Sequence, residues 1–80
     1  MNTQLADLLL NDRGFAFNPA SGETYQLNTT GLVMVRLMQQ GLDHEEILKQ
    51  IREKFDVDDH TALRDLEAFI DETEKLGWKP

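Results

Sequence analysis

The sequence predicts an α+β fold in which a three-stranded antiparallel sheet is followed by three helices (βββααα). Before residue 28, short alternating apolar segments are separated by turn-forming residues at 11–14 and 18–22. After residue 28, apolar residues recur at the three- and four-residue spacing of amphipathic helices. Because no linker or repeat interrupts the 80 residues, we expect a single domain over residues 1–80.

The three strands are expected at residues 5–10, 14–17 and 23–27. Residues 5–10 also fit helical spacing, but the turn at 11–14 favours a first strand that makes a three-stranded meander. A five-residue loop with Pro and Gly then joins the second and third strands as a hairpin. Alternation predicts the side chains that this sheet contributes to the core, namely Phe15, Phe17, Tyr25 and Leu27.

Capping residues predict where the helices begin and end. Residues 28–30 offer N-caps for a first helix, and Gly41 is typical of its left-handed C-cap. Asp43 and Glu46 form the pattern of a capping box for a second helix. A third helix begins at Asp58 or Asp59 and is ended by Gly77. The apolar stripes of the second and third helices are Ile47, Leu48, Ile51 and Phe55, and Ala62, Leu63, Leu66, Phe69 and Ile70.

Composition and charge restrict the function. The chain is 40% hydrophobic, has no cysteine, and carries a formal net charge of −7. Twelve of its fifteen acids lie in residues 41–80, a half that nucleic acid and anionic membranes would repel. No apolar run is long enough to span a membrane, and residues 1–10 lack the Lys or Arg of a targeting peptide. We therefore expect a cytoplasmic protein that binds neither nucleic acid nor membrane.

The residues that catalysis or a cofactor would need are scarce. Ser21 is the only serine, and it lies in a turn. His44 and His60 lie near acids but lack the spacing and number of zinc ligands. The glycines match no phosphate-binding loop. We expect neither an enzyme nor a metal or cofactor site.

Binding by the third strand is the remaining hypothesis. If Glu23–Leu27 is a sheet edge, its free N–H and C=O groups could pair with an extended peptide. The pattern alone favours an edge protected by twist or by the charge of Glu23.

Residues 22–31 (Gly-Glu-Thr-Tyr-Gln-Leu-Asn-Thr-Thr-Gly) resemble the G-x-x-x-x-L-N-x-T-G signature of the PqqD-like family. These proteins are small peptide chaperones of pyrroloquinoline quinone (PQQ) biosynthesis, and they are related to the recognition elements of other ribosomal-peptide modifying systems. The similarity covers roughly residues 5–78 and includes Gly41–Ile47, Phe55–Asp58, Leu66–Ile70 and Leu76–Trp78. The family often has an aromatic residue at the position of Val35 and a leucine at that of Thr73, which marks both as packing positions.

This resemblance implies a winged helix-turn-helix that binds the leader of a precursor peptide as an added strand and presents it to a modifying enzyme such as a radical-SAM protein. Carried over, the pairing strand is Glu23, Thr24, Tyr25, Gln26 and Leu27. The groove wall on the third helix is Leu63, Arg64, Glu67, Ile70 and Asp71.

Two alternatives stay open. A winged-helix DNA-binding protein would read bases with the third helix, where seven acids outnumber the two cations, Arg64 and Lys75. A small structural subunit would use its apolar edge to form a homodimer, which a core of this size favours.

Overall fold

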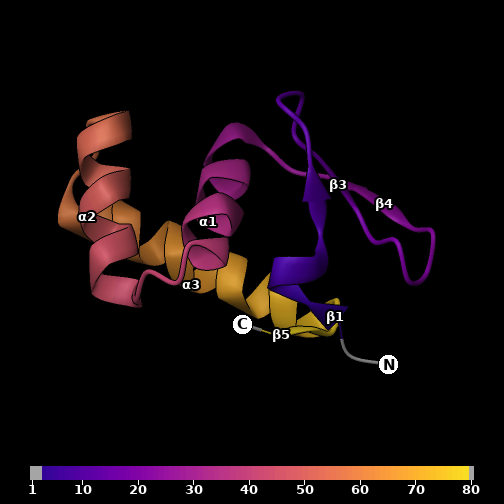
Figure 1. Cartoon of the computed structure of the whole chain (residues 1–80). Coiled ribbons are helices and arrows are strands. Elements are labelled where there is room, and N and C mark those ends of the chain that lie inside the picture. Colours follow the sequence, from indigo (N-terminus) through magenta and orange to yellow (C-terminus); the bar gives the residue numbers. More distant parts are fainter. Residues whose placement is uncertain (1–2, 80) are drawn as a thin grey trace.

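The computed structural model describes residues 3–79. Its strands are β1 (Thr3–Gln4), β2 (Leu9–Leu10), β3 (Phe15–Phe17), β4 (Thr24–Gln26) and β5 (Trp78–Lys79). Its helices are the 3-10 turn η1 (Leu5–Asp7) and the α-helices α1 (Thr29–Gln39), α2 (His44–Phe55) and α3 (Asp59–Lys75). Strands β2, β3 and β4 form an antiparallel sheet in that order, followed by the three α-helices, which confirms the predicted fold class. In Figure 1, α1 stands between α2 and the sheet, and α3 runs beneath them towards β5.

The helix caps are the predicted ones. Asn28 caps α1 by accepting a 2.7 Å hydrogen bond from the Gly31 N–H. Asp43 and Glu46 form both halves of the capping box at the start of α2, and Asp58 caps α3. Left-handed glycines follow α1 and α3, at Gly41 and Gly77. Short-range capping chemistry therefore sets the starts of all three helices and the ends of α1 and α3.

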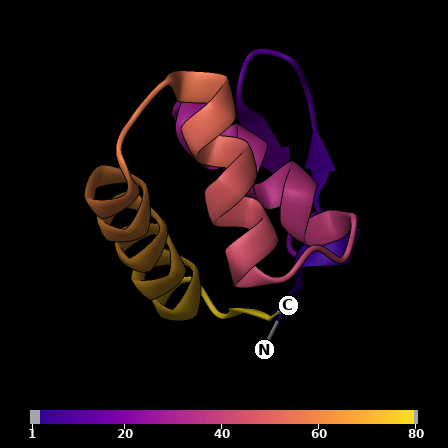
Figure 2. The same ribbon diagram turned by 90° about the vertical axis from the view of Figure 1, so that its left-hand side faces the viewer.

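The core consists of two clusters that Phe69 and Met38 join. One cluster lies between the sheet, η1, α1 and β5, and its buried members are Leu5, Leu8, Ala16, Val35 and Trp78. The other lies among the three helices and contains Met34, Ile47, Ile51, Ala62 and Leu66. Figure 2 shows α2 in front of α1, with α3 along its side, around this second cluster. Val35 and Thr73 are both buried, as expected for packing positions.

The predicted inward face of β3 is wrong. Ala16 is fully buried, whereas Phe15 and Phe17 are 37% and 38% exposed. Ala16 stands opposite Tyr25 in the sheet, so these two residues share the inner face. The alanine leaves room for Val35 of α1 and for the half-buried Tyr25 against the same cluster. Both phenylalanines instead lie on the outer face.

The first predicted strand is only partly present. Residues 5–7 form a 3-10 turn, and only Leu9–Leu10 pair with β3. The turn places Leu5 and Leu8, three residues apart, in the same cluster, and the Leu8 N–H donates to the Leu5 carbonyl at 3.2 Å. The Gln39 side chain donates to the carbonyls of Leu5 and Leu8 and holds the turn against α1.

Two further features differ from the predictions. Leu63, expected in the core stripe of α3, is 44% exposed. Strands β1 and β5 also form a small parallel sheet of their own, with Thr3 opposite Trp78. The Thr3 N–H donates to the Gly77 carbonyl at 2.9 Å, and the Asn18 side chain donates to the Thr3 hydroxyl at 2.8 Å. This sheet holds Trp78 beneath the three-stranded sheet.

Candidate functional site

Strand β4 is an edge strand. It pairs with β3 on one side, and among the described residues no strand lies on its other side. Hydrogen bonds from Leu27 N–H to Gly14 O (2.7 Å) and from Asn18 N–H to Glu23 O (2.8 Å) frame the pairing. Since antiparallel pairs alternate, Thr24 and Gln26 turn their N–H and C=O groups away from β3, towards the open edge.

A groove runs along this open edge. It has a volume of about 500 Å³ and lies between β4, the start of α1, the last turns of α3, and β5. We call it the edge groove, and its lining residues are Thr24, Tyr25, Gln26, Leu27, Asn28, Gly31, Phe69, Glu72, Leu76 and Trp78. The edge strand and a partly apolar groove therefore lie side by side.

Aromatic side chains form the base of the edge groove. The Tyr25 and Trp78 rings meet edge to face, with centroids 5.1 Å apart and planes at 82°. Trp78 is only 2% exposed, and its Nε1 is the one buried side-chain nitrogen or oxygen within residues 3–79 that lacks a hydrogen-bond partner. The Tyr25 hydroxyl donates to Glu23 Oε2 at 2.9 Å, and this bond raises the pKa of Tyr25, with smaller contributions from desolvation and the Glu23 charge. The Glu23 carboxylate, whose charge was expected to protect the edge, is thus hydrogen-bonded to Tyr25 of β4.

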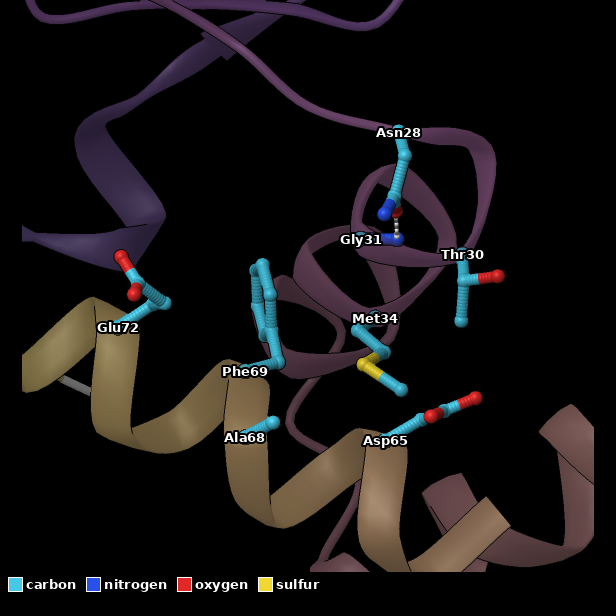
Figure 3. Close-up of a pocket in the computed structure, with 8 residues that line it drawn as sticks. All are labelled: Asn28, Thr30, Gly31, Met34, Asp65, Ala68, Phe69 and Glu72. Carbon is cyan, nitrogen blue, oxygen red and sulfur yellow. Dashed lines mark hydrogen bonds between the residues drawn. The ribbon is translucent and has the colours of Figure 1, made fainter. Parts of the chain in front are cut away.

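A second pocket adjoins the edge groove and shares Phe69 with it (Figure 3). This Phe69 pocket, of about 290 Å³, lies between the first turns of α1 and the side of α3 that faces them. It is lined by Asn28, Thr30, Gly31, Met34, Asp65, Ala68, Phe69 and Glu72. A Cβ on Gly31 would stand 3.1 Å from the Phe69 ring, so the missing side chain lets the ring pack close to α1. In the L-N-x-T-G segment, Asn28 therefore caps α1, and Gly31 allows the Phe69 ring to pack against that helix.

The structure brings only part of the predicted site together. Of the predicted strand residues, Thr24 to Leu27 line the edge groove, and Glu23 bonds to Tyr25 beside it. The predicted α3 residues lie elsewhere. Leu63, Arg64 and Glu67 surround a separate depression of about 220 Å³ with His60.

The other two predicted α3 residues also lie outside the edge groove. Ile70 packs into the cluster among the helices, and Asp71 forms a 3.1 Å ion pair with Lys75. On α3 and at its C-cap, the residues that line the edge groove are instead Phe69, Glu72 and Leu76. Their i, i+3, i+7 spacing is a helical stripe, but the apolar pattern assigned Phe69 to the core and gave no reason to select the other two.

Within residues 3–79, no three His, Asp or Glu side chains are grouped so that they could hold a metal ion. None of the described helices is long and apolar enough to cross a membrane. The free backbone groups and the aromatic base of the edge groove, with its single carboxylate on Glu72, are suited to binding an extended chain.

A family model described as Coenzyme PQQ synthesis protein D (PqqD) matches residues 13–78. The match includes β3, β4, all three α-helices and Trp78, and so every residue that lines the two pockets. No curated protein and no solved structure matches the chain.

Proposed function

Because this chain belongs to the PqqD family, we propose that it is a peptide-binding adaptor of PQQ biosynthesis or of a related ribosomal-peptide pathway. It captures the leader of a precursor peptide as an extra strand beside β4 and presents it to a modifying enzyme such as a radical-SAM protein. It performs no catalytic step of its own. The observation that carries the proposal is the open β4 edge directly beside the edge groove.

Backbone pairing supplies only part of the required affinity. Four outward-facing groups, on Thr24 and Gln26, would contribute about 2–6 kcal/mol at roughly 0.5–1.5 kcal/mol for each hydrogen bond. Association costs about 4–15 kcal/mol in lost freedom, so the ladder alone leaves little or no net affinity. Each apolar leader side chain buried in the edge groove would add about 1.5–3 kcal/mol. The groove beside the strand is therefore as necessary as the edge itself.

The sheet register predicts which side chains of the leader enter the groove. Tyr25 and Leu27 point inward from β4, whereas the side chains of Thr24 and Gln26 are exposed. An added strand follows the same pleat, so every second leader residue would face Trp78 and α3. A leader with alternating apolar residues fits this site.

Amide hydrogen exchange of the ¹⁵N-labelled protein tests the proposal, with a synthetic leader-like peptide of alternating apolar residues as the probe. The Thr24 and Gln26 amides should become protected on binding, because they gain partners. The Tyr25 and Leu27 amides already face β3 and should change little. Protection confined to other regions, or equal protection at all four amides, would contradict strand addition.

A second copy of the chain could occupy the same edge, so sedimentation with and without the leader is the control. A monomer that forms a one-to-one complex supports the adaptor. A dimer whose β4 amides are protected before any peptide is added identifies an assembly subunit instead.

A further inference from the structure

The Phe69 pocket extends the edge groove beyond the end of β4, and its chemistry differs from that of the groove base. The two spaces share Asn28, Gly31, Phe69 and Glu72. Figure 3 shows the Phe69 ring between Glu72 on one side and Met34 and Asp65 on the other. A side chain that leaves the edge groove past Leu27 therefore enters a space with an apolar wall and carboxylates at both ends.

The apolar wall suits the stem of a long side chain. Phe69 is half-buried and presents its aromatic ring to the pocket, and Met34, which is only 1% exposed, lines it behind that ring. The methylene stems of Lys and Arg pack on such surfaces while their charged ends stay hydrated. A cation near the face of the Phe69 ring would gain a further attraction.

The charge of the pocket favours a cation. Asp65 and Glu72 lie two turns apart on α3, and among the described ion pairs Glu72 has no partner. Lys75 forms its ion pair with Asp71 at 3.1 Å, and this bond, followed by the charges of Asp71 and Glu72, raises the pKa of Lys75. Arg64 Nε is 3.8 Å from Asp65 Oδ1, near the outer limit of an ion pair, so Arg64 offsets only part of the Asp65 charge.

The start of α1 opposes this preference but does not reverse it. Its N-terminus carries a partial charge of roughly +0.5, which attracts anions. One of its N–H groups, that of Gly31, is already bonded to the Asn28 side chain. The Glu72 carboxylate, together with the partly offset charge of Asp65, outweighs the remaining partial charge.

We propose that the Phe69 pocket selects a Lys or Arg of the bound peptide, an inference that rests on the proposed function. The basic residue lies two positions from an apolar residue that covers Tyr25 and Trp78, because alternate residues of a strand share a face. Its stem lies on Met34 and Phe69, and its charge lies near Glu72 and Asp65. The ligand class is thus an extended peptide in which an apolar and a basic residue are spaced i, i+2.

Selection from a random 12-residue peptide library displayed on mRNA tests this directly. The wild-type protein is compared with the double variant Asp65→Asn/Glu72→Gln. The matched control is Glu53→Gln/Glu74→Gln, which makes the same change in net charge at two exposed helix residues outside the pocket. Wild type and control should enrich the apolar–x–basic spacing, and the pocket variant should lose it.

Calorimetric titration of one selected peptide then measures the contact. Replacing its basic residue by Gln should weaken binding to the wild-type protein about tenfold and to the pocket variant less than about twofold. The wild-type effect should shrink as salt is added, because the carboxylates are partly exposed.

The outcomes separate this inference from the proposed function. If selected peptides protect the Thr24 and Gln26 amides but show no basic enrichment, the inference is wrong and strand addition stands. The inference is also wrong if the control variant loses the preference as fully as the pocket variant. If no selected peptide protects those amides, the proposed function fails and this inference fails with it.

Discussion

Replacing Gln26 by proline should block peptide pairing while preserving most of the fold. The Gln26 N–H points to the open edge, so proline removes no hydrogen bond to β3. The cost to the free energy of unfolding is then a modest backbone strain of about 1 kcal/mol. Tyr25→Pro is the matched contrast, because the Tyr25 N–H faces β3 and its ring contacts Trp78.

The effect on binding follows from the geometry of the ladder. Gln26→Pro removes one of four outward groups, worth about 0.5–1.5 kcal/mol. The pyrrolidine ring also occupies the space of the lost hydrogen, while a paired strand must approach to about 4.8 Å. Together these effects should weaken peptide binding by at least about tenfold.

Urea unfolding and calorimetric titration measure the two effects separately. Gln26→Pro should bind poorly and unfold near the wild-type midpoint, whereas Tyr25→Pro should be clearly destabilised. If Gln26→Pro is folded and binds its peptide at full strength, the peptide does not add to β4. If the two variants are equally unstable, the assigned direction of the β4 amides is wrong.

Three further predictions concern stability and titration. Leu66→Ala should lower the free energy of unfolding by about 2–5 kcal/mol in urea, and Leu63→Ala by less than about 1 kcal/mol, because only Leu66 is buried; equal losses would contradict the described core. Gly14→Ala should lower the thermal midpoint more than Gly22→Ala. Both glycines have positive φ, but only at Gly14 would a Cβ clash, since it would lie 2.5 Å from the Leu27 carbonyl oxygen. Equal losses would show that the strain arises from the backbone conformation alone. Glu23→Gln should lower the pKa of Tyr25, the only tyrosine, towards 10.0 in an ultraviolet titration, because the hydrogen bond to Glu23 and its charge raise it. Because the Tyr25 pKa is raised in the folded protein, this group stabilises the fold below pH 10, and the effect is lost as pH rises through the pKa of the folded state. An unchanged Tyr25 titration in Glu23→Gln would refute the hydrogen bond between Tyr25 and Glu23.

Local chemistry made the helices predictable. Asn28, Asp43 and Asp58 each accept a backbone N–H within their own helix, so a few neighbouring residues specify each start. The order of strands and helices followed from the change in apolar period at residue 28. These features depend on short stretches of chain and hardly on the tertiary arrangement.

The faces were harder to predict because alternation gives a period without a direction. Phe15 and Phe17 are more apolar than Ala16, yet the space against Val35 and Tyr25 admits only the small residue. Strands β1 and β5 have two residues each and lie near opposite ends of the described chain, so no local sequence pattern predicts that they pair.

The groove wall was missed for a similar reason. Leu63 and Phe69 are both apolar residues on α3, and only the position of the sheet decides which one faces β4. The strand itself was predicted at Glu23–Leu27 from its alternating side chains, and it is present as the edge strand Thr24–Gln26. A strand can therefore be located from sequence more readily than the helix face packed beside it.

The chain carries its own optical probe of the edge groove. Trp78 is the only tryptophan, and it lies beneath Tyr25 in a nearly dry environment. Its emission should therefore be blue-shifted in the free protein, and a ligand carboxylate or carbonyl that reached the unpartnered indole N–H would shift it to the red. Occupancy of the site could then be followed in unlabelled protein, by a signal that arises at the site itself.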